Sequence, residues 1–371
     1  MNYREVAALK KSIGIMTIHT TYNYGAVLQA YATEAFYNTH GFDAELIDYT
    51  NDHIQEQLKL FYKQDGKLKG YFITFIRNVF FGRLHYYRKA FGKIKDICRF
   101  SKESYTSLEQ LNQTKYDILV AGSDQLWNPL ISGKLDPAFF LQFGKGRKIS
   151  VASSIGSSVL KADEIEQVKG YLKDFDAISV REEFAKEQLQ PLTDKDIKIL
   201  LDPTLLLSRD HWMEKVAVRS KYNGIGEKYI VTYFAGGNKG SHRRIISEYA
   251  AKFNLPVWTI QYSNYTWKES SKKILGATME DFVALIANAA LVITDSFHGV
   301  AFSVNLNTDF VALTNKANPV RVKALLDKLD IADRIDMEPE AYHPVDYAEI
   351  TPKLLRLQED SINWAVQAAE G

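Results

Sequence analysis

The chain has 371 residues, of which 46% are hydrophobic and 25% are charged, and its formal net charge is +1. These values are typical of a globular protein with room for two domains, and they exclude disordered and fibrous classes and a general attraction to nucleic acid. The single cysteine, Cys98, excludes intramolecular disulfides and thiolate-rich metal sites. It also fits a reducing compartment, so we expect a cytoplasmic protein without a signal peptide or a transmembrane helix.

Apolar strand-like segments alternate with helix-like ones, which is typical of α/β proteins with parallel sheets. We predict strands at 12–18, 44–49, 116–121, 147–153, 177–180 and 198–201, and a second series at 229–234, 256–260, 291–294 and 308–313. Helical patterns cover 26–39, 181–189, 320–329 and 349–369, and another helix begins at 300. The irregular polar stretch between the two series predicts an N-terminal domain, 1–205, and a C-terminal domain, 206–371, whose last helix could return to the first domain.

Residues 54–110 interrupt the first series with a long, aromatic-rich segment of helical pattern. Between Lys59 and Arg99 there are eleven Lys or Arg residues and two acidic ones, a local charge of +9, which leaves 1 − 9 = −8 for the rest. Such an insertion could lie on an anionic membrane surface. We favour the alternative, a helical cap or a contact between copies in a homo-oligomer, with its charges in solvent.

Four polar loops follow predicted strands and precede helices, at 19–25, 121–128, 179–182 and 295–299. Ligands of open α/β sheets bind beyond the carboxyl ends of the strands, where helix N-termini present unpaired N–H groups to anions. We therefore expect the four loops to meet in a cleft between the two domains.

The loop Asp295-Ser296-Phe297-His298-Gly299 has the strongest chemical content. His298 could donate or accept a proton near neutral pH, and Gly299 would let a ligand approach the backbone closely. The structural alternative is a histidine that is hydrogen-bonded within the fold.

The side chains of two further loops each allow a functional and a structural interpretation. In Gly122–Asn128, Asp124 and Asn128 could orient sugar hydroxyls while Trp127 stacks on a sugar, or Asp124 could cap the next turn while Trp127 fills the core. Arg181 could clamp a carboxylate or phosphate, or pair locally with Glu182 or Glu183.

Several familiar motifs are missing. The turn at 20–26 lacks G-x-G-x-x-G and the Lys-Ser/Thr of a nucleotide-binding loop, and the chain has no HExxH, no Cys pair and no G-x-S-x-G. We therefore expect no metal site and no serine-hydrolase site.

Six segments, taken in order, resemble the polysaccharide pyruvyl transferase family. They are 23–31 (NYGAVLQAY), 122–129 (GSDQLWNP), 150–156 (SVASSIG), 179–182 (SVRE), 201–206 (LDPTLL) and 294–299 (TDSFHG). One departure is Val320, just before Arg321, where the family pattern has serine.

The resemblance implies two Rossmann-like domains that face a cleft, similar to the GT-B fold of glycosyltransferases. It implies phosphoenolpyruvate as donor, no separate cofactor and no metal, and as acceptor a sugar of a cell-surface or exopolysaccharide glycan, lipid-linked or free as an oligosaccharide. The product would be a pyruvate ketal on two hydroxyls of one sugar, with phosphate released. Such an enzyme would work in the cytoplasm, in contact with the inner face of the membrane where lipid-linked glycans are built.

Under this resemblance His298 is the candidate acid, and Arg181 holds a carboxylate or phosphate together with the helix start at Gly299. The remaining candidate substrate-binding residues are Asn23, Gly25, Ser123, Asp124, Asp295, Ser296 and Arg321. Two alternatives stay open: a nucleotide-sugar glycosyltransferase on the same fold, and a glycan-binding protein without turnover.

Overall fold

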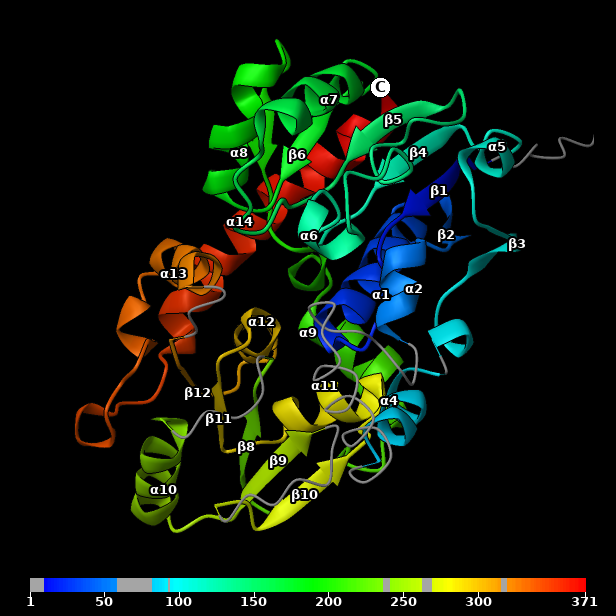
Figure 1. The fold of residues 1–371 in the computed structure, drawn as a ribbon. Coiled ribbons are helices and arrows are strands. Elements are labelled where there is room, and N and C mark those ends of the chain that lie inside the picture. Colours follow the sequence, from blue (N-terminus) through cyan, green and yellow to red (C-terminus); the bar gives the residue numbers. More distant parts are fainter. Residues whose placement is uncertain (1–9, 59–81, 93, 236–240, 262–268, 315–318) are drawn as a thin grey trace, which may run out of the picture.

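The structure is a computed structural model that describes residues 10–58, 82–92, 94–235, 241–261, 269–314 and 319–371. Within these residues, two five-stranded parallel sheets form the framework of the protein (Figure 1). The strands of the N-terminal sheet are β1 (Ser12–Met16), β2 (Asp43–Tyr49), β3 (Phe100–Tyr105), β4 (Ile118–Ala121) and β5 (Arg147–Ser150). Those of the C-terminal sheet are β8 (Ile230–Tyr233), β9 (Val257–Gln261), β10 (Lys272–Leu275), β11 (Leu291–Thr294) and β12 (Phe310–Ala312).

Both sheets have the same strand order. The N-terminal sheet runs β3-β2-β1-β4-β5 and the C-terminal sheet β10-β9-β8-β11-β12, with parallel pairing throughout. In each sheet the chain starts at the centre, winds outward to one edge, and then crosses back to build the other edge. This is the Rossmann-like order, so the predicted α/β class with two Rossmann-like sheets is confirmed, and each sheet has its switch point between its first and fourth strands.

A short pair of strands extends the N-terminal sheet. β6 (Ile178–Val180) pairs with β7 (Ile197–Ile199), and single bridges join Ile149 to Ala177 and Ser153 to Val180. β6 therefore lies beside β5, which brings the end of β6 to the same edge as the loops after β1 and β4.

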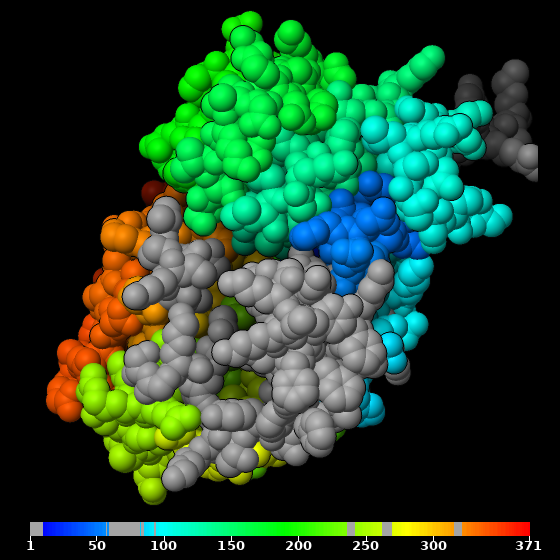
Figure 2. Space-filling model, viewed as in Figure 1, coloured from blue at the N-terminus to red at the C-terminus, as the bar shows by residue number. Residues whose placement is uncertain are grey.

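The longer helices connect these strands. They are α1 (Tyr24–Thr39), α4 (Arg83–Phe91), α7 (Ala162–Leu172), α8 (Glu183–Leu189), α10 (Ser241–Phe253), α11 (Met279–Ala287), α12 (Phe297–Asn305), α13 (Pro319–Lys328) and α14 (Tyr347–Glu370). Shorter helical segments are α2 (Asp52–Gln57), α5 (Leu108–Leu111), α6 (Pro129–Ser132), α9 (Arg209–His211), a π-helix at Trp212–Val216 and 3-10 turns at Ile94–Asp96, Gln190–Leu192, Pro203–Leu205, Ala217–Arg219, Ala332–Arg334 and Pro339–Ala341. In the space-filling view, the surface of α7 and α8 (green) lies above that of α13 (orange) (Figure 2).

The helix α1 packs against both halves of the molecule. Tyr24, its first residue, stacks on Phe282 of α11 with ring centroids 4.6 Å apart and donates a hydrogen bond to the carbonyl of Ala277 at 2.5 Å. One hydrophobic cluster accordingly contains residues of both sheets, such as Ile13 and Val231. The two halves therefore meet over a buried, apolar contact.

The last helix, α14, runs from the C-terminal half to the N-terminal sheet (red in Figure 1). The carbonyl of its Ala368 accepts a hydrogen bond from Arg147 Nε at 2.7 Å, and its Ser361 accepts one from the backbone of Leu201 at 3.1 Å. These contacts tie β5 and the turn after β7 to the end of the chain.

Two strands, β3 and β10, lie where no strand was predicted. β3 falls inside 54–110, a segment predicted to be helical, and its three exposed side chains, Lys102, Glu103 and Ser104, are polar. Both strands lie at sheet edges, where backbone pairing on one side suffices and no apolar run is required. Residues 59–81 of the predicted insertion lie outside the described residues, and no helix elsewhere in the described chain is long and apolar enough to cross a membrane.

Candidate functional site

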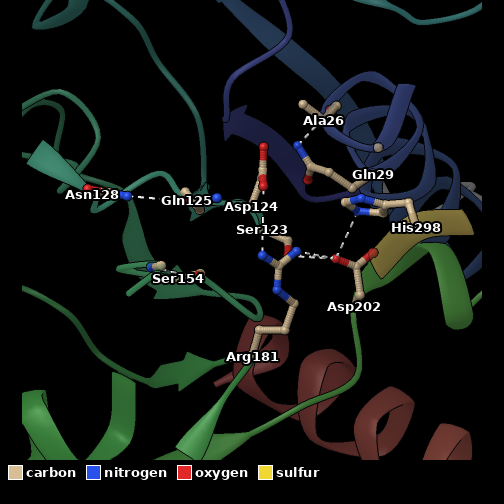
Figure 3. A network of polar contacts seen from close by, with 12 residues as sticks. Ala26, Gln29, Ser123, Asp124, Gln125, Asn128, Ser154, Arg181, Asp202 and His298 are labelled. Carbon is tan, nitrogen blue, oxygen red and sulfur yellow. Dashed lines mark hydrogen bonds and ion pairs between the residues drawn. The ribbon is translucent and has the colours of Figure 1, made fainter. Parts of the chain in front are cut away.

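The predicted loops of both halves come together at one place. Arg181 follows β6, Asp202 precedes the turn Pro203–Leu205, and His298 is the second residue of α12. Figure 3 shows these three side chains pointing toward one another, with Ser123 and Asp124 of the loop after β4 next to them. The site therefore combines the carboxyl ends of strands from both sheets.

Asp202 is the centre of this group. Its Oδ2 accepts hydrogen bonds from Arg181 Nη1 at 2.6 Å and from Ser123 Oγ at 3.4 Å, and lies 3.5 Å from His298 Nε2. Its Oδ1 accepts from the backbone N and the hydroxyl of Thr204 at 3.0 and 2.7 Å. Burial opposes its ionisation, but His298 and Arg181 outweigh burial and hold the pKa of Asp202 well below its usual range. Asp202 is therefore a fixed anion at neutral pH.

Arg181 is buried among three carboxylates. Besides Asp202, its guanidinium lies 3.6 Å from Glu182 and 3.7 Å from Asp124. Burial would lower the pKa of Arg181, but the three carboxylates, Asp202 foremost, raise it above its ordinary value. The local contact of Arg181 with Glu182 is therefore present, while its role as a clamp for a carboxylate or phosphate stays a prediction. Its Nε and Nη2 atoms are buried and make no hydrogen bond to a described residue.

His298 reaches across the domain boundary and packs against α1. A Cβ on Gly25 would lie 1.8 Å from His298 Nδ1, so the imidazole occupies the space that this glycine leaves open. His298 is 6% exposed, and its Nε2 lies 3.5 Å from Asp202 Oδ2, at the limit of a hydrogen bond. The pairing of Gly25 with His298 therefore fixes where the C-terminal half contacts the first turn of α1.

The other residues of the 295–299 loop hold the backbone in place. Ser296 caps α12 by accepting from Gly299 N at 3.4 Å, and Asp295 accepts from Ala235 N at 2.9 Å. A Cβ on Gly299 would lie 2.4 Å from Thr294 Oγ1. The space where a side chain would stand therefore belongs to Thr294, and the glycine lets α12 pack against the end of β11. That Gly299 binds a ligand through its backbone stays a prediction.

In the loop after β4, some side chains lie in the core and others at the candidate site. Trp127 is 1% exposed, stacks on Phe140 at 5.1 Å and donates to the carbonyl of Phe139, so it fills the core and does not stack on a sugar. Asn128 caps α6, accepting from Leu130 N at 3.0 Å. Asp124 has a φ of 67°, the left-handed region in which a non-glycine residue is strained. This strained residue turns its carboxylate toward Arg181.

A pocket lies between the two halves beside Arg181, with about 360 Å³ of empty space if the part open to solvent is included. Its C-terminal wall contains Phe297, Arg321 and Lys328. The ring of Phe297 lies 5.1 Å from the guanidinium carbon of Arg181 and 5.9 Å from that of Arg321. Burial and the proximity of Arg181 lower the pKa of Arg321 to about 10, and burial lowers the pKa of Lys328. This wall is therefore cationic and suited to an anion.

Of the predicted site residues, Arg181 and Arg321 line this pocket, and Asp124 and His298 lie beside it through their contacts with Arg181 and Asp202. The other predicted residues have structural contacts. Asn23 is exposed and caps α1 through Gly25 N at 2.9 Å, and Ser123 is fully buried, donating to the carbonyl of Ala152 at 2.8 Å. Asp202 and Phe297 were not predicted as site residues, although Asp202 stands in the matched segment 201–206. An aspartate before proline at a strand end reads as a turn cap, which Asp202 also is.

In the described part of the chain, no three His, Cys, Asp or Glu side chains group as ligands for a metal ion. The charged groups of the site are instead three carboxylates (Asp124, Glu182, Asp202), three cations (Arg181, Arg321, Lys328) and the imidazole of His298.

Three of the solved structures that resemble this chain are a glycosyltransferase, an epimerase and a heptosyltransferase. The glycosyltransferase SnogD from Streptomyces nogalater is 12% identical, with 98% of each chain covered and a TM-score of 0.48. The UDP-GlcNAc 2-epimerase from Neisseria meningitidis, bound to UDP-GlcNAc, is 10% identical, with 97% of this chain and 93% of that chain covered and a TM-score of 0.46. The heptosyltransferase WaaC from E. coli, with ADP, is 13% identical, with 84% and 89% covered and a TM-score of 0.40.

No curated protein sequence matches the chain significantly. The family model for polysaccharide pyruvyl transferase matches residues 23–317, which include the loops at Gly25, Asp124, Arg181, Asp202 and His298. The match covers most of the chain, and the chain therefore belongs to the polysaccharide pyruvyl transferase family.

Proposed function

We propose that this protein transfers the pyruvyl group of phosphoenolpyruvate to a sugar of a cell-surface glycan, forming a ketal and releasing phosphate. Beside the family match, one observation carries the proposal. Buried polar atoms that make no hydrogen bond within the described chain gather at the site: Nε and Nη2 of Arg181, Oε2 of Glu182, Nε2 of His298 and Oε1 of Gln29. All but the last have only longer ionic contacts, at 3.5 to 3.7 Å. Such atoms are costly in a folded protein, and a polar ligand would satisfy them.

The donor carries a phosphate and a carboxylate, and the pocket offers two guanidinium groups to receive them. The guanidinium groups of Arg181 and Arg321 both lie within 6 Å of the ring of Phe297. The three carboxylates of the site balance its three cations, so the site has room for the charge of an anionic donor beside the arginines.

In the proposed reaction, His298 gives a proton to the methylene carbon of the donor, and the double-bond electrons form the new C–H bond. C2 becomes electrophilic, and one sugar hydroxyl attacks it and passes its proton back to His298. The bond between C2 and the phosphate oxygen then breaks, phosphate leaves with the bonding electrons, and the second hydroxyl bonds to C2 while its proton goes to the departing phosphate. Asp202, 3.5 Å from Nε2, stabilises the imidazolium before transfer, and Asp124, 3.7 Å from Arg181, is the carboxylate that we propose orients the acceptor.

Incubation of the full chain with phosphoenolpyruvate and a panel of galactosides and hexosamines, lipid-linked and free, tests the proposal. We expect phosphate release together with an acceptor mass gain equal to the donor minus phosphoric acid, and loss of both in Arg181→Ala. Release of nucleotide from a nucleotide sugar would identify a glycosyltransferase instead. Donor or glycan binding with no turnover on any acceptor would identify a binding protein.

A further inference from the structure

A second, larger pocket lies at the other end of α1 from His298. One wall is formed by α1 residues Tyr31, Glu34 and Asn38, and the other by the segment 211–219, which connects the two sheets. The pocket has about 1050 Å³ of empty space. Nine residues separate Gly25 from Glu34, so the pocket lies about 14 Å along the helix from the candidate site.

The charged side chains that line this pocket form no ion pairs with one another. They are Glu34, Glu214, Lys215, Arg219 and Glu280. None forms an ion pair with another of them or with any residue in the described part of the chain. Carboxylates and cations thus share one cavity while staying apart from one another.

Glu34 is the innermost of these charges. The residue is 6% exposed, and its Oε1 accepts a hydrogen bond from Asn38 at 2.5 Å, whereas no described residue hydrogen-bonds to Oε2. Burial raises the pKa of Glu34 to about 7, although Arg99 acts in the opposite direction. A buried carboxylate without a cation is costly, and a ligand ammonium group would offset that cost.

The opposite charges lie at the rim. Lys215 and Arg219 are both exposed and belong to the connecting segment. Between rim and floor, the hydroxyl of Tyr31 is hydrogen-bonded to His211 Nε2 at 2.9 Å and joins the two walls. A ligand that reached from Glu34 to the rim would therefore span both walls.

Both walls touch the elements that build the candidate site. The connecting segment contains a π-helix, Trp212–Val216, a rare conformation that often marks functional sites. Trp212 packs edge-on against Phe302 of α12 at 4.8 Å and lies 5.5 Å from Tyr31. An occupant would thus lie between α1, which contacts His298, and the segment that supports the helix carrying His298.

We propose that this pocket binds a small zwitterion, whose ammonium group pairs with Glu34 and whose phosphate or carboxylate pairs with Lys215 and Arg219. The site is separate from the pocket at Arg181 and does not depend on the proposed transferase activity. The proposal predicts that a ligand with both charges on one molecule binds more tightly than a ligand with either charge alone.

Isothermal titration calorimetry of the full chain with ω-aminoalkyl phosphates of increasing length tests this proposal at about pH 8, where Glu34 is mostly ionised and the amines are protonated. The matched controls are the hydroxyalkyl phosphate and the aminoalkanol of each length. We expect the best aminoalkyl phosphate to bind about tenfold more tightly than either control, the gain of one charge-assisted hydrogen bond.

Glu34→Gln should reduce binding of the aminoalkyl phosphate to that of the hydroxyalkyl phosphate, and Lys215→Gln/Arg219→Gln should reduce it to that of the aminoalkanol. Glu359→Gln, the same change at an exposed position of α14, should leave all affinities unchanged. The proposal is overturned if no length of aminoalkyl phosphate exceeds its controls, or if Glu34→Gln keeps the preference for the amine.

Discussion

Buried carboxyl groups lie near both ends of α1, but in the described part of the chain only those near its first turn have a cation beside them. At its first turn, around Asp202, every carboxylate lies within 4 Å of Arg181, and the pKa of Asp202 falls well below its usual range. At its third turn, Glu34 is also buried, though less completely, and no cation of the described residues lies within that distance, so its pKa rises to about 7. Burial is common to both carboxyl groups. The presence of a counter-charge therefore decides which of them is fixed and which titrates.

Replacing the central groups of the paired site should produce the largest effect. We expect His298→Ala to lower the turnover of the proposed reaction about 1000-fold, the usual contribution of a general acid, while donor binding persists through the arginines. Turnover and donor affinity, measured by phosphate release and calorimetry, separate these two quantities. Unchanged turnover would remove His298 from the chemistry.

Gly25→Ala tests whether the imidazole needs the space on α1. An added Cβ would overlap His298 Nδ1, so the ring must move, and we expect turnover to fall about 100-fold. Alanine itself suits a helix, so Gly25→Ala combined with His298→Ala should be at least as stable as His298→Ala alone. Thermal unfolding of the three variants completes a double-mutant cycle, and additive effects would contradict the contact.

Asp202→Asn tests the counter-charge itself. Removing one partner of a buried ion pair should lower the free energy of unfolding by about 3 kcal/mol at neutral pH. Because the folded pKa of Asp202 is depressed, its stabilisation is present above the unfolded value of about 4 and is lost as pH falls below it. The difference between wild type and variant should therefore shrink below about pH 4 in denaturant titrations. A constant difference would mean that the charge of Asp202 is not what stabilises the fold.

Glu34→Gln should give the smallest effect, with the opposite sign. Because the folded pKa of Glu34 is raised, the wild type loses stability as pH rises from about 4.5 to about 7. We expect the variant to equal the wild type below that window and to exceed it by about 2 kcal/mol above it. The charged and titratable groups near Glu34 are Tyr31, Cys98, Arg99, His211, Glu214, Lys215, Arg219 and Glu280. A variant that tracks the wild type at every pH would show that one of these cations neutralises Glu34 in solution.

The sequence by itself determined the strand–loop–helix units and the identity of the loops that carry chemistry. Apolar runs such as 291–294 mark buried strands, and the polar residues that follow, including Arg181 and His298, lie where the carboxyl ends of parallel strands must lie. The order of the matched segments likewise specified the family. These features are local, because each depends on residue type and spacing over a few positions.

The tertiary structure decided which of these residues meet and what each one does. Nothing near Asp202 in the sequence indicates Arg181 or His298 as its partners, and Gly25 shows its purpose only when the imidazole from 273 residues further along packs on it. Trp127 could have faced a sugar or the core until packing placed it beside Phe140. The edge strands β3 and β10 were missed for a related reason. Their pairing is set by neighbouring backbones, and such long-range contacts leave no periodic signal in the segment itself.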